Sequence, residues 1–223
     1  SKLGAGALTA STKSGDLSLK SAEVDISGAA ELTAKQSITA TEASVEAASL
    51  AMTAETGSVE ASGFTATVTG QASVEAGDSV TLDGSKLGLG ALTASAKSGD
   101  LSLKSAEIEV SGAAELTAQQ SITAVDAKVT SDSLTMTAEM GKLDGSRLTA
   151  TVADQASIEA GNSVKLDGSK LGLGAFTATA NSGDLSLKSA ELEVSGAAEL
   201  TAQESITATD ANVTSNSLAM TAK

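Results

Sequence analysis

Acidic residues at turns are the first feature of this sequence that could do chemistry. Carboxylates in glycine-rich turns suit Ca²⁺, but a calcium-binding solenoid needs dense Asp ladders with further carboxylates nearby. Most turns here carry one Asp, so we expect each carboxylate to hydrogen-bond its own turn backbone, and we predict no metal site. The aspartates concerned are Asp16, Asp83, Asp100, Asp144, Asp167 and Asp184.

Paired carboxylates are the second candidate. Glu107 and Glu109 lie two residues apart, as do Glu191 and Glu193, and residues two apart on a strand point the same way. Such a pair could work as acid and base, but a convex strand surface offers no pocket that excludes water. We expect these pairs to serve solubility.

The remaining composition excludes most catalytic chemistry. The 223 residues include no His, Cys, Pro, Trp or Tyr, which removes the commonest general bases, nucleophiles and soft metal ligands. We therefore predict no catalytic residues, no cofactor and no enzymatic activity.

Charge argues against two classes of partner. The formal net charge is −14, whereas nucleic acids and anionic membranes attract basic surfaces. No apolar run reaches the ~20 residues of a membrane span. The basic residues that recur lie beside glutamates, and we expect them to reduce repulsion between stacked strands. They are Lys2, Lys86 and Lys170, with Lys20, Lys104 and Lys188.

A long repeat organises the chain. The stretch SGDLSLKSAE occurs at 14–23, 98–107 and 182–191, which defines an 84-residue period. We divide the chain into repeats 1–84, 85–168 and a partial repeat 169–223, one continuous array and a segment of a longer chain. A weaker 42-residue period lies within it. Between copies, inward positions change only between apolar types while outward positions vary freely, and we expect no odd segment that breaks the symmetry to form a site.

Within each repeat, apolar and polar residues alternate in short bursts about every seven residues. Examples are Leu101-x-Leu103, Ile108-x-Val110 and Ile122-x-Ala124, with Gly, Asp, Asn and Ser between bursts. Alternation indicates strands with one buried face, and the intervening residues favour turns. Evenly spaced short strands with a fixed repeat length predict an all-β fold, a parallel β-solenoid.

Three arrangements are compatible with strands that begin about every seven residues. Triangular 21-residue coils place Leu87/Leu89 and Leu101/Leu103 on two regular faces, with a third face that alternates between two phases. Two-strand 14-residue coils leave one face that slips. An interwoven trimeric β-prism would have the same spacing of strands along the sequence. We favour 21-residue coils, because three sheets enclose more apolar side chain.

Thr-x-Thr pairs are the third candidate site. In 14-residue coils several pairs share one face, and such arrays resemble the ice-binding surfaces of some antifreeze proteins. Glu107 and Glu109 interrupt that face, and Ala51 and Ala219 replace one Thr, so we interpret the pairs as exposed strand residues. The pairs are Thr65/Thr67, Thr135/Thr137, Thr149/Thr151 and Thr177/Thr179.

The whole-chain pattern, as in GDLSLKSAEIEVSGAAELTA, loosely resembles the β-helical shafts of phage-baseplate and type VI secretion spikes. That resemblance implies a trimeric shaft of an injection machine. The repeat itself favours a structural fibre, stalk or filament segment outside the cell or on its surface, which self-associates end to end or as a homotrimer. An adhesive or ice-binding module is the alternative.

Overall fold

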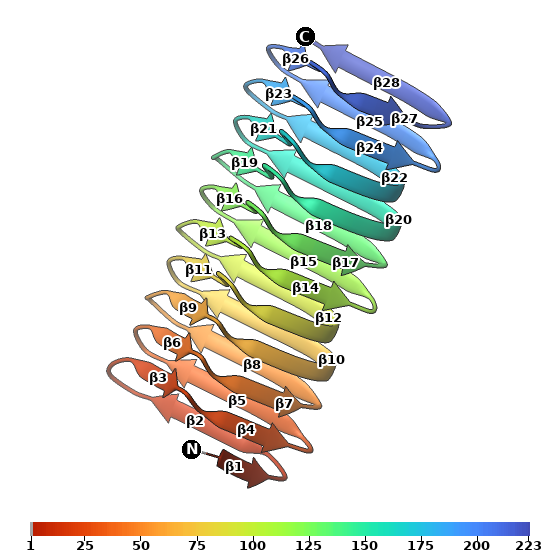
Figure 1. The fold of residues 1–223 in the computed structure, drawn as a ribbon. Helices are drawn as coiled ribbons and strands as arrows, with labels where there is room; N and C mark the ends of the chain where they lie inside the picture. The colour runs from red at the N-terminus through yellow and green to blue at the C-terminus, as the bar shows by residue number, and fades with distance from the viewer. Residues whose placement is uncertain (1) are drawn as a thin grey trace.

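A computed structural model describes residues 2–223, with side chains from Leu3 onward. The chain winds into a stack of three-sided coils, and β1 and β28 lie at opposite ends of the stack (Figure 1). Strands of successive coils pair in parallel. The prediction of an all-β parallel solenoid is therefore confirmed.

The first face carries the strands that open each coil. On this face each residue pairs with its counterpart one coil later, as Lys86 does with Glu107 and Glu107 with Lys128. Its strands are β1 (Lys2–Ala5), β4 (Glu23–Ile26), β7 (Ser44–Ala47), β14 (Glu107–Val110), β17 (Lys128–Ser131), β24 (Glu191–Val194) and β27 (Asn212–Thr214), with the first halves of β10 (Thr65–Ala76), β12 (Lys86–Ala96), β20 (Thr149–Ala160) and β22 (Lys170–Ala180).

The second face follows the first around a corner. The four long strands, β10, β12, β20 and β22, continue through this corner from one face to the other. Hydrogen bonding therefore joins both faces into one 18-stranded sheet. Besides the second halves of the four long strands, this face contains β2 (Leu8–Thr12), β5 (Ala29–Ala34), β8 (Ser49–Ala54), β15 (Ala113–Ala118), β18 (Ser133–Ala138), β25 (Ala197–Ala202) and β28 (Ser217–Ala222).

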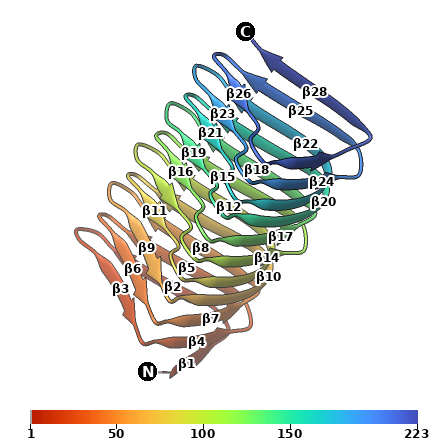
Figure 2. The same ribbon diagram turned by 45° about the horizontal axis from the view of Figure 1, so that its top comes forward.

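The third face is a separate 10-stranded sheet of mostly short strands, seen beside the longer strands when the stack is tilted (Figure 2). Its members are β3 (Leu17–Lys20), β6 (Ile38–Thr41), β9 (Val59–Ser62), β11 (Val80–Thr81), β13 (Leu101–Ser102), β16 (Ile122–Thr123), β19 (Leu143–Asp144), β21 (Val164–Lys165), β23 (Leu185–Ser186) and β26 (Ile206–Thr207).

Each strand finds its neighbours one coil away in the same chain, and the register of these pairs selects the 21-residue coil. Leu101 pairs with Ile122, which pairs in turn with Leu143. Neither the 14-residue coil nor an interwoven prism gives these pairings. The regular stacks expected on two faces are confirmed.

The second face explains the 42-residue period. Leu92 pairs with Ala114, a step of 22 in the sequence, and Ala114 pairs with Leu134, a step of only 20. The same steps of 22 and 20 recur from Leu134 to Ala156 and from Ala156 to Phe176. Two successive coils therefore form the structural unit, and the expected alternation of this face is confirmed.

Corner lengths produce this alternation. Three residues separate Val110 from Ala114, whereas two separate Ser131 from Leu134. The corner between the second and third faces compensates for this difference. It has four residues in the coils whose first corner has two residues, and three residues in the other coils. Glycine recurs in these longer corners at positions 15, 57, 99, 141 and 183. A Cβ at Gly141 would collide with the carbonyl oxygen of Gln120 in the coil before, so glycine permits this close approach.

The core is a column of small and medium aliphatic side chains enclosed by the three faces. Val129, Ile122 and Leu116 are each at most 1% exposed. The two phenylalanines, Phe64 and Phe176, are also buried. Inward substitutions between repeats, Leu92 to Phe176 and Ile108 to Leu192, keep apolar side chains in buried positions.

Candidate functional site

The acidic turn residues bind the next coil rather than their own turn, which corrects the expectation for five of the six. The Asp16 and Asp100 carboxylates accept hydrogen bonds from the backbone N–H of Ser37 and Ser121, both at 2.9 Å and both one coil ahead. The carboxylate of Asp184 accepts from the Ser205 hydroxyl in the same way.

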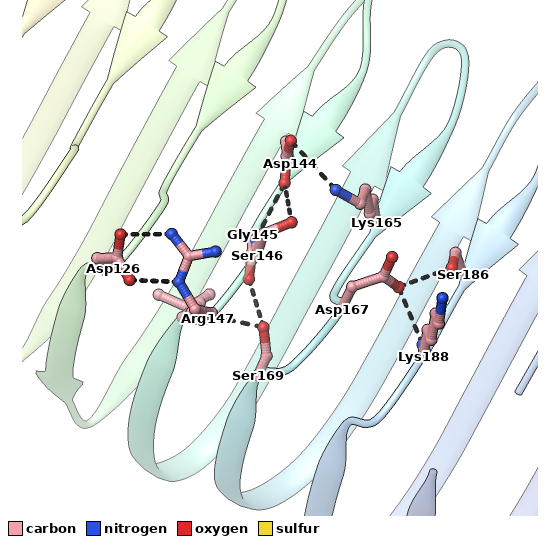
Figure 3. Close-up of polar contacts among 11 residues, drawn as sticks. Asp126, Asp144, Gly145, Ser146, Arg147, Lys165, Asp167, Ser169, Ser186 and Lys188 are labelled. Carbon is pink, nitrogen blue, oxygen red and sulfur yellow. Dashed lines mark hydrogen bonds and ion pairs between the residues drawn. The ribbon is translucent and has the colours of Figure 1, made fainter. Parts of the chain in front are cut away.

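Asp83 and Asp167 repeat this arrangement at the corner between the third and first faces. Asp167 Oδ1 accepts the backbone N–H of Lys188 at 2.9 Å and the hydroxyl of Ser186 at 2.7 Å, and Asp83 has the equivalent two bonds (Figure 3). Only Asp144 behaves as expected, since its Oδ1 accepts the N–H of Ser146 in its own turn at 3.0 Å. The other five carboxylates link successive coils through hydrogen bonds, and Asp144 Oδ2 also lies 3.8 Å from Lys165 Nζ in the next coil.

Serine hydroxyls continue this series of hydrogen bonds from one coil to the next. The Ser37 hydroxyl accepts the N–H of Ser58, and the Ser121 hydroxyl accepts the N–H of Lys142, each at 3.2 Å. The column through Asp16, Ser37 and Ser58 thus satisfies corner donors from coil to coil. Corner N–H groups that lack a strand partner would otherwise need water.

A second column consists of residues in left-handed backbone conformation. It lies between the third and first faces, and one member occurs in each 21-residue coil. The glycines are Gly63, Gly84 and Gly168, and the others are Ser21, Glu42, Ser105, Asp126, Arg147, Ser189 and Asp210, with φ between 47° and 67°. Non-glycine residues pay roughly 1–2 kcal/mol for this conformation. The corner shape is therefore imposed by stacking rather than by residue preference.

The segment from Lys142 to Leu148 breaks the symmetry of the repeats, contrary to our expectation. Arg147, the only arginine of the sequence, occupies the left-handed column where the preceding repeat has Gly63. Its Nε and Nη2 donate to the two carboxylate oxygens of Asp126, both at 2.6 Å (Figure 3). The unique Arg in the sequence was the signal that could have identified this segment.

The Arg147 pair shifts both ionisations. The guanidinium hydrogen bonds hold the pKa of Asp126 below its ordinary value, while partial desolvation opposes this shift, and the same bonds raise the pKa of Arg147. The side chains of Asp126 and Arg147 are 48% and 61% exposed, so the pair clamps two neighbouring coils at the surface.

The Thr-x-Thr pairs divide between two faces, because the chain forms 21-residue coils and not 14-residue coils. Thr65/Thr67 and Thr149/Thr151 point outward from the first face, whereas Thr135/Thr137 and Thr177/Thr179 lie on the second. Glutamates interrupt the second-face column, as Glu115 pairs with Thr93 on one side and Thr135 on the other. No unbroken threonine array arises from these pairs.

The paired glutamates lie on the first face, pointing outward. Glu107 is bracketed by Lys128 at 2.9 Å and Lys86 at 3.7 Å, and Glu109 lies 3.6 Å from Lys128. The Lys128 hydrogen bond, aided by the charges of Lys128 and Lys86, holds the pKa of Glu107 below its ordinary value. Glu107 is thus kept ionised, as a partner of lysines.

The recurrent lysines behave partly as expected. Lys86 and Lys170 pair with Glu107 and Glu191 in the next coil, at 3.7 Å and 3.5 Å. The side chain of Lys2 lies outside the described part of the structure. Lys20 ends β3, and Lys104 and Lys188 lie in the turns after β13 and β23, at the corner between the third and first faces.

Among the shallow hollows of the first face, two lie one 84-residue repeat apart above glycines. One lies over Gly88, lined by Thr65, Thr67, Lys86, Glu107 and Glu109. Its copy lies over Gly172, lined by Thr149, Thr151, Lys170, Glu191 and Glu193. A glycine in each strand leaves the backbone bare at these points. Both hollows are open to solvent, so they suit a protruding side chain better than an enclosed small molecule.

Within residues 2–223, no cluster of three or more His, Cys, Asp or Glu residues has the arrangement needed to hold a metal ion. Over the same residues, the structure contains no helix with the length and hydropathy of a membrane span.

Comparison with known proteins gives one similarity. Residues 153–221 match a family described as repeats of unknown function (DUF5649), which covers about a third of the chain. No curated protein and no solved structure matches the chain. The chain is therefore similar to a repeat family, and the pairing of its strands shows the β-solenoid independently.

Proposed function

We propose that this chain is a structural segment, a rod whose role is to set length and stiffness in a fibre, stalk or filament. The observation that carries the proposal is the unbroken stack. Throughout residues 2–223 each strand pairs with strands of the adjacent coils, and no inserted loop or domain interrupts a coil. Such stacking makes length proportional to repeat number.

The surface supports a role without catalysis. The paired glutamates engage lysines on exposed strands, the acidic turn residues bridge coils, and the two hollows are shallow. We place the rod outside the cell or on its surface, where a strongly acidic, repetitive chain suits an appendage. Immunogold labelling of intact cells that produce the protein tests this location.

The two alternative functions receive less support. A spike shaft woven from three chains would use strands of different chains as neighbours, whereas each coil here stacks on the previous coil of its own chain. An ice-binding face needs a flat, unbroken hydroxyl array, and Glu115 and Glu199 interrupt the second face. Adhesion through a regular face stays an alternative that a pull-down with surface polymers can test.

Deletion and duplication of one whole repeat test the rod. Removing residues 85–168 takes away four coils and joins Gly84 to Ser169, which follows Gly168 in the intact chain. The rod should shorten by about 19 Å, at about 4.8 Å per coil, and a duplicate of 85–168 should lengthen it equally. Small-angle scattering measures both lengths, and a particle whose length does not follow repeat number contradicts the proposal.

A further inference from the structure

The outward surface of the first face carries alternating charge. Along one column the outward residues are Lys86, Glu107, Lys128, Thr149, Lys170 and Glu191, each paired in register with the next. Opposite charges therefore recur with the 84-residue period. Lys86 and Lys170 are each 72% exposed, so their ammonium groups remain available to a second partner.

A neighbouring column on the same face alternates between protrusions and hollows. It runs through Gly88, Glu109, Thr130, Thr151, Gly172 and Glu193. The hollow over Gly88 lies beside Lys86, and the hollow over Gly172 lies beside Lys170. Each hollow therefore combines a bare backbone floor with one exposed lysine and two glutamates, so it accepts a protruding side chain by its shape rather than by its charge.

We propose that the first face pairs with the first face of a second copy of this chain, antiparallel, about a twofold axis that passes between β17 and β20. This inference rests on the proposed structural role, because lateral pairing is how rods form a thicker fibre. A twofold interface brings the same patch from both subunits together. Charge complementarity in the first column and shape complementarity in the second favour a second copy of the chain as the partner of this face.

The register follows from the two columns. The axis places Lys86 opposite Glu191 of the second copy and Glu107 opposite its Lys170, and symmetry doubles each pair. In the neighbouring column, Glu193 of one copy faces the hollow over Gly88 of the other, and Glu109 faces the hollow over Gly172. The protruding glutamates thus match the hollows in shape, while the charge match of the pair lies in the first column. When one rod slides along the other by four coils, about 19 Å, the same types of residue face each other again. Two rods can therefore overlap in steps of one 84-residue repeat.

The parallel arrangement is disfavoured by the same residues. A twofold axis along the rod would exchange the two columns within each coil. Glu107 would then face Glu109, and Glu191 would face Glu193. Like charges directly opposite each other are destabilising, so the charge pattern selects the antiparallel pair.

Charge in this interface should govern specificity more than affinity. The lysines already have partners within the chain, and desolvation offsets much of the gain from burying ion pairs. Association should therefore be weak, because added salt screens these ion pairs, whereas at low salt the net charge of −14 on each copy repels a second copy.

Charge reversal in the full chain tests the pair. Analytical ultracentrifugation over a concentration series at about 0.15 M salt, where long-range repulsion is screened, should show dimers for the unmodified protein and monomers for the double variant Lys86→Glu, Lys170→Glu. The matched control is Lys104→Glu, Lys188→Glu, which alters net charge equally and has the same 84-residue spacing at another corner; it should still dimerise. Circular dichroism confirms that each variant keeps its strands.

Mixing two variants gives the decisive result. The variant Glu107→Lys, Glu191→Lys should be monomeric alone, and an equimolar mixture with Lys86→Glu, Lys170→Glu should restore association. Failure of the unmodified chain to associate at any concentration, or failure of the mixture to restore it, overturns the proposal. A rod of the expected length that stays monomeric would overturn the proposed pairing and would leave the proposed structural role intact.

Cross-linking tests the register, since the chain has no native cysteine. A mixture of Gly88→Cys and Glu193→Cys chains should cross-link with a reagent that spans about 10 Å, the separation of facing sheets. Within one chain these positions are five coils apart, about 24 Å. The control mixture uses Thr123→Cys, on the third face, with Glu193→Cys. Equal yields in both mixtures would contradict the antiparallel register.

Discussion

Ser131 is a buried hydroxyl at an inward position of the first face. It is 4% exposed, pairs in register with Val152, and its Oγ has no hydrogen-bond partner among the described residues. An unsatisfied buried polar group costs roughly 1–3 kcal/mol. The serine therefore represents a local loss of stability in the core.

We expect Ser131→Val to stabilise the fold by about 1 kcal/mol, because it removes the unsatisfied hydroxyl and matches Val152 in the next coil. Urea unfolding measures the change. The control is Ser186→Val, whose hydroxyl donates to Asp167 Oδ1 at 2.7 Å; this change should destabilise. Equal effects of the two substitutions would argue against the buried, unpartnered state of Ser131.

Inward and outward positions should respond very differently to charge. Val110 is 4% exposed and faces the core, so Val110→Asp should cost several kcal/mol by leaving an unpaired charge in an apolar interior. Thr123 points outward from the third face, so Thr123→Lys should cost less than about 1 kcal/mol. Denaturant midpoints compare the two variants, and similar losses would refute the assigned orientation.

Acid should weaken the surface clamps of the central coils. The pKa values of Glu107 and Asp126 lie below their ordinary values of 4.5 and 3.8 when the chain is folded. A lowered folded-state pKa gives a stabilising contribution that is complete above the ordinary value and is lost as pH falls through the folded value. We therefore expect stability to decline below about pH 5.

The variants Lys128→Met and Arg147→Met identify which groups cause this decline. Each removes the cation that lowers one carboxyl pKa, so the stability of each should depend less on pH between 5 and 2 than that of the unmodified chain. Thermal unfolding across this range measures the slope. An unchanged slope in both variants would assign the acid response to other carboxylates.

At the scale of elements, the structural unit is a pair of coils. Corners of different length alternate along the stack, so the four-residue corner at Gly141 lies against the three-residue corner at Gln120. A single coil cannot be removed without bringing two corners of the same length together. This dependence on neighbours is typical of repeat proteins, where stability includes a term for each interface.

A 42-residue deletion should therefore be tolerated better than a 21-residue deletion. Removing 107–148 preserves the alternation of corners, whereas removing 107–127 stacks two coils with the same corner lengths. We expect the 21-residue deletion to show the lower melting temperature, although it removes less of the core. The opposite order in a calorimetric comparison would show that alternation has no energetic role.

At the scale of the molecule, stability should grow with coil number, because each added coil contributes its own burial and one more interface. The core contains many alanines, so each coil contributes a modest hydrophobic term at ~25 cal/mol per Å². Duplication of residues 85–168 should raise both the denaturant midpoint and the m-value. A midpoint independent of repeat number would indicate coils that unfold separately.

The sequence by itself determined the strands, their inward and outward residues and the 84- and 42-residue periods. Alternation and turn residues are local signals, so Leu101, Ile108 and Ile122 could be assigned to the core without coordinates. The absence of His and Cys likewise limits the available chemistry through composition alone.

Only the tertiary structure decided which residues meet along the axis. The choice of a 21-residue coil brings Asp100 to the N–H of Ser121, Arg147 to Asp126 and Lys86 to Glu107, and it separates the Thr-x-Thr pairs onto two faces. Contacts between coils depend on the number of residues per turn and on corner length. Local alternation is the same for every candidate coil length, so it cannot specify those contacts.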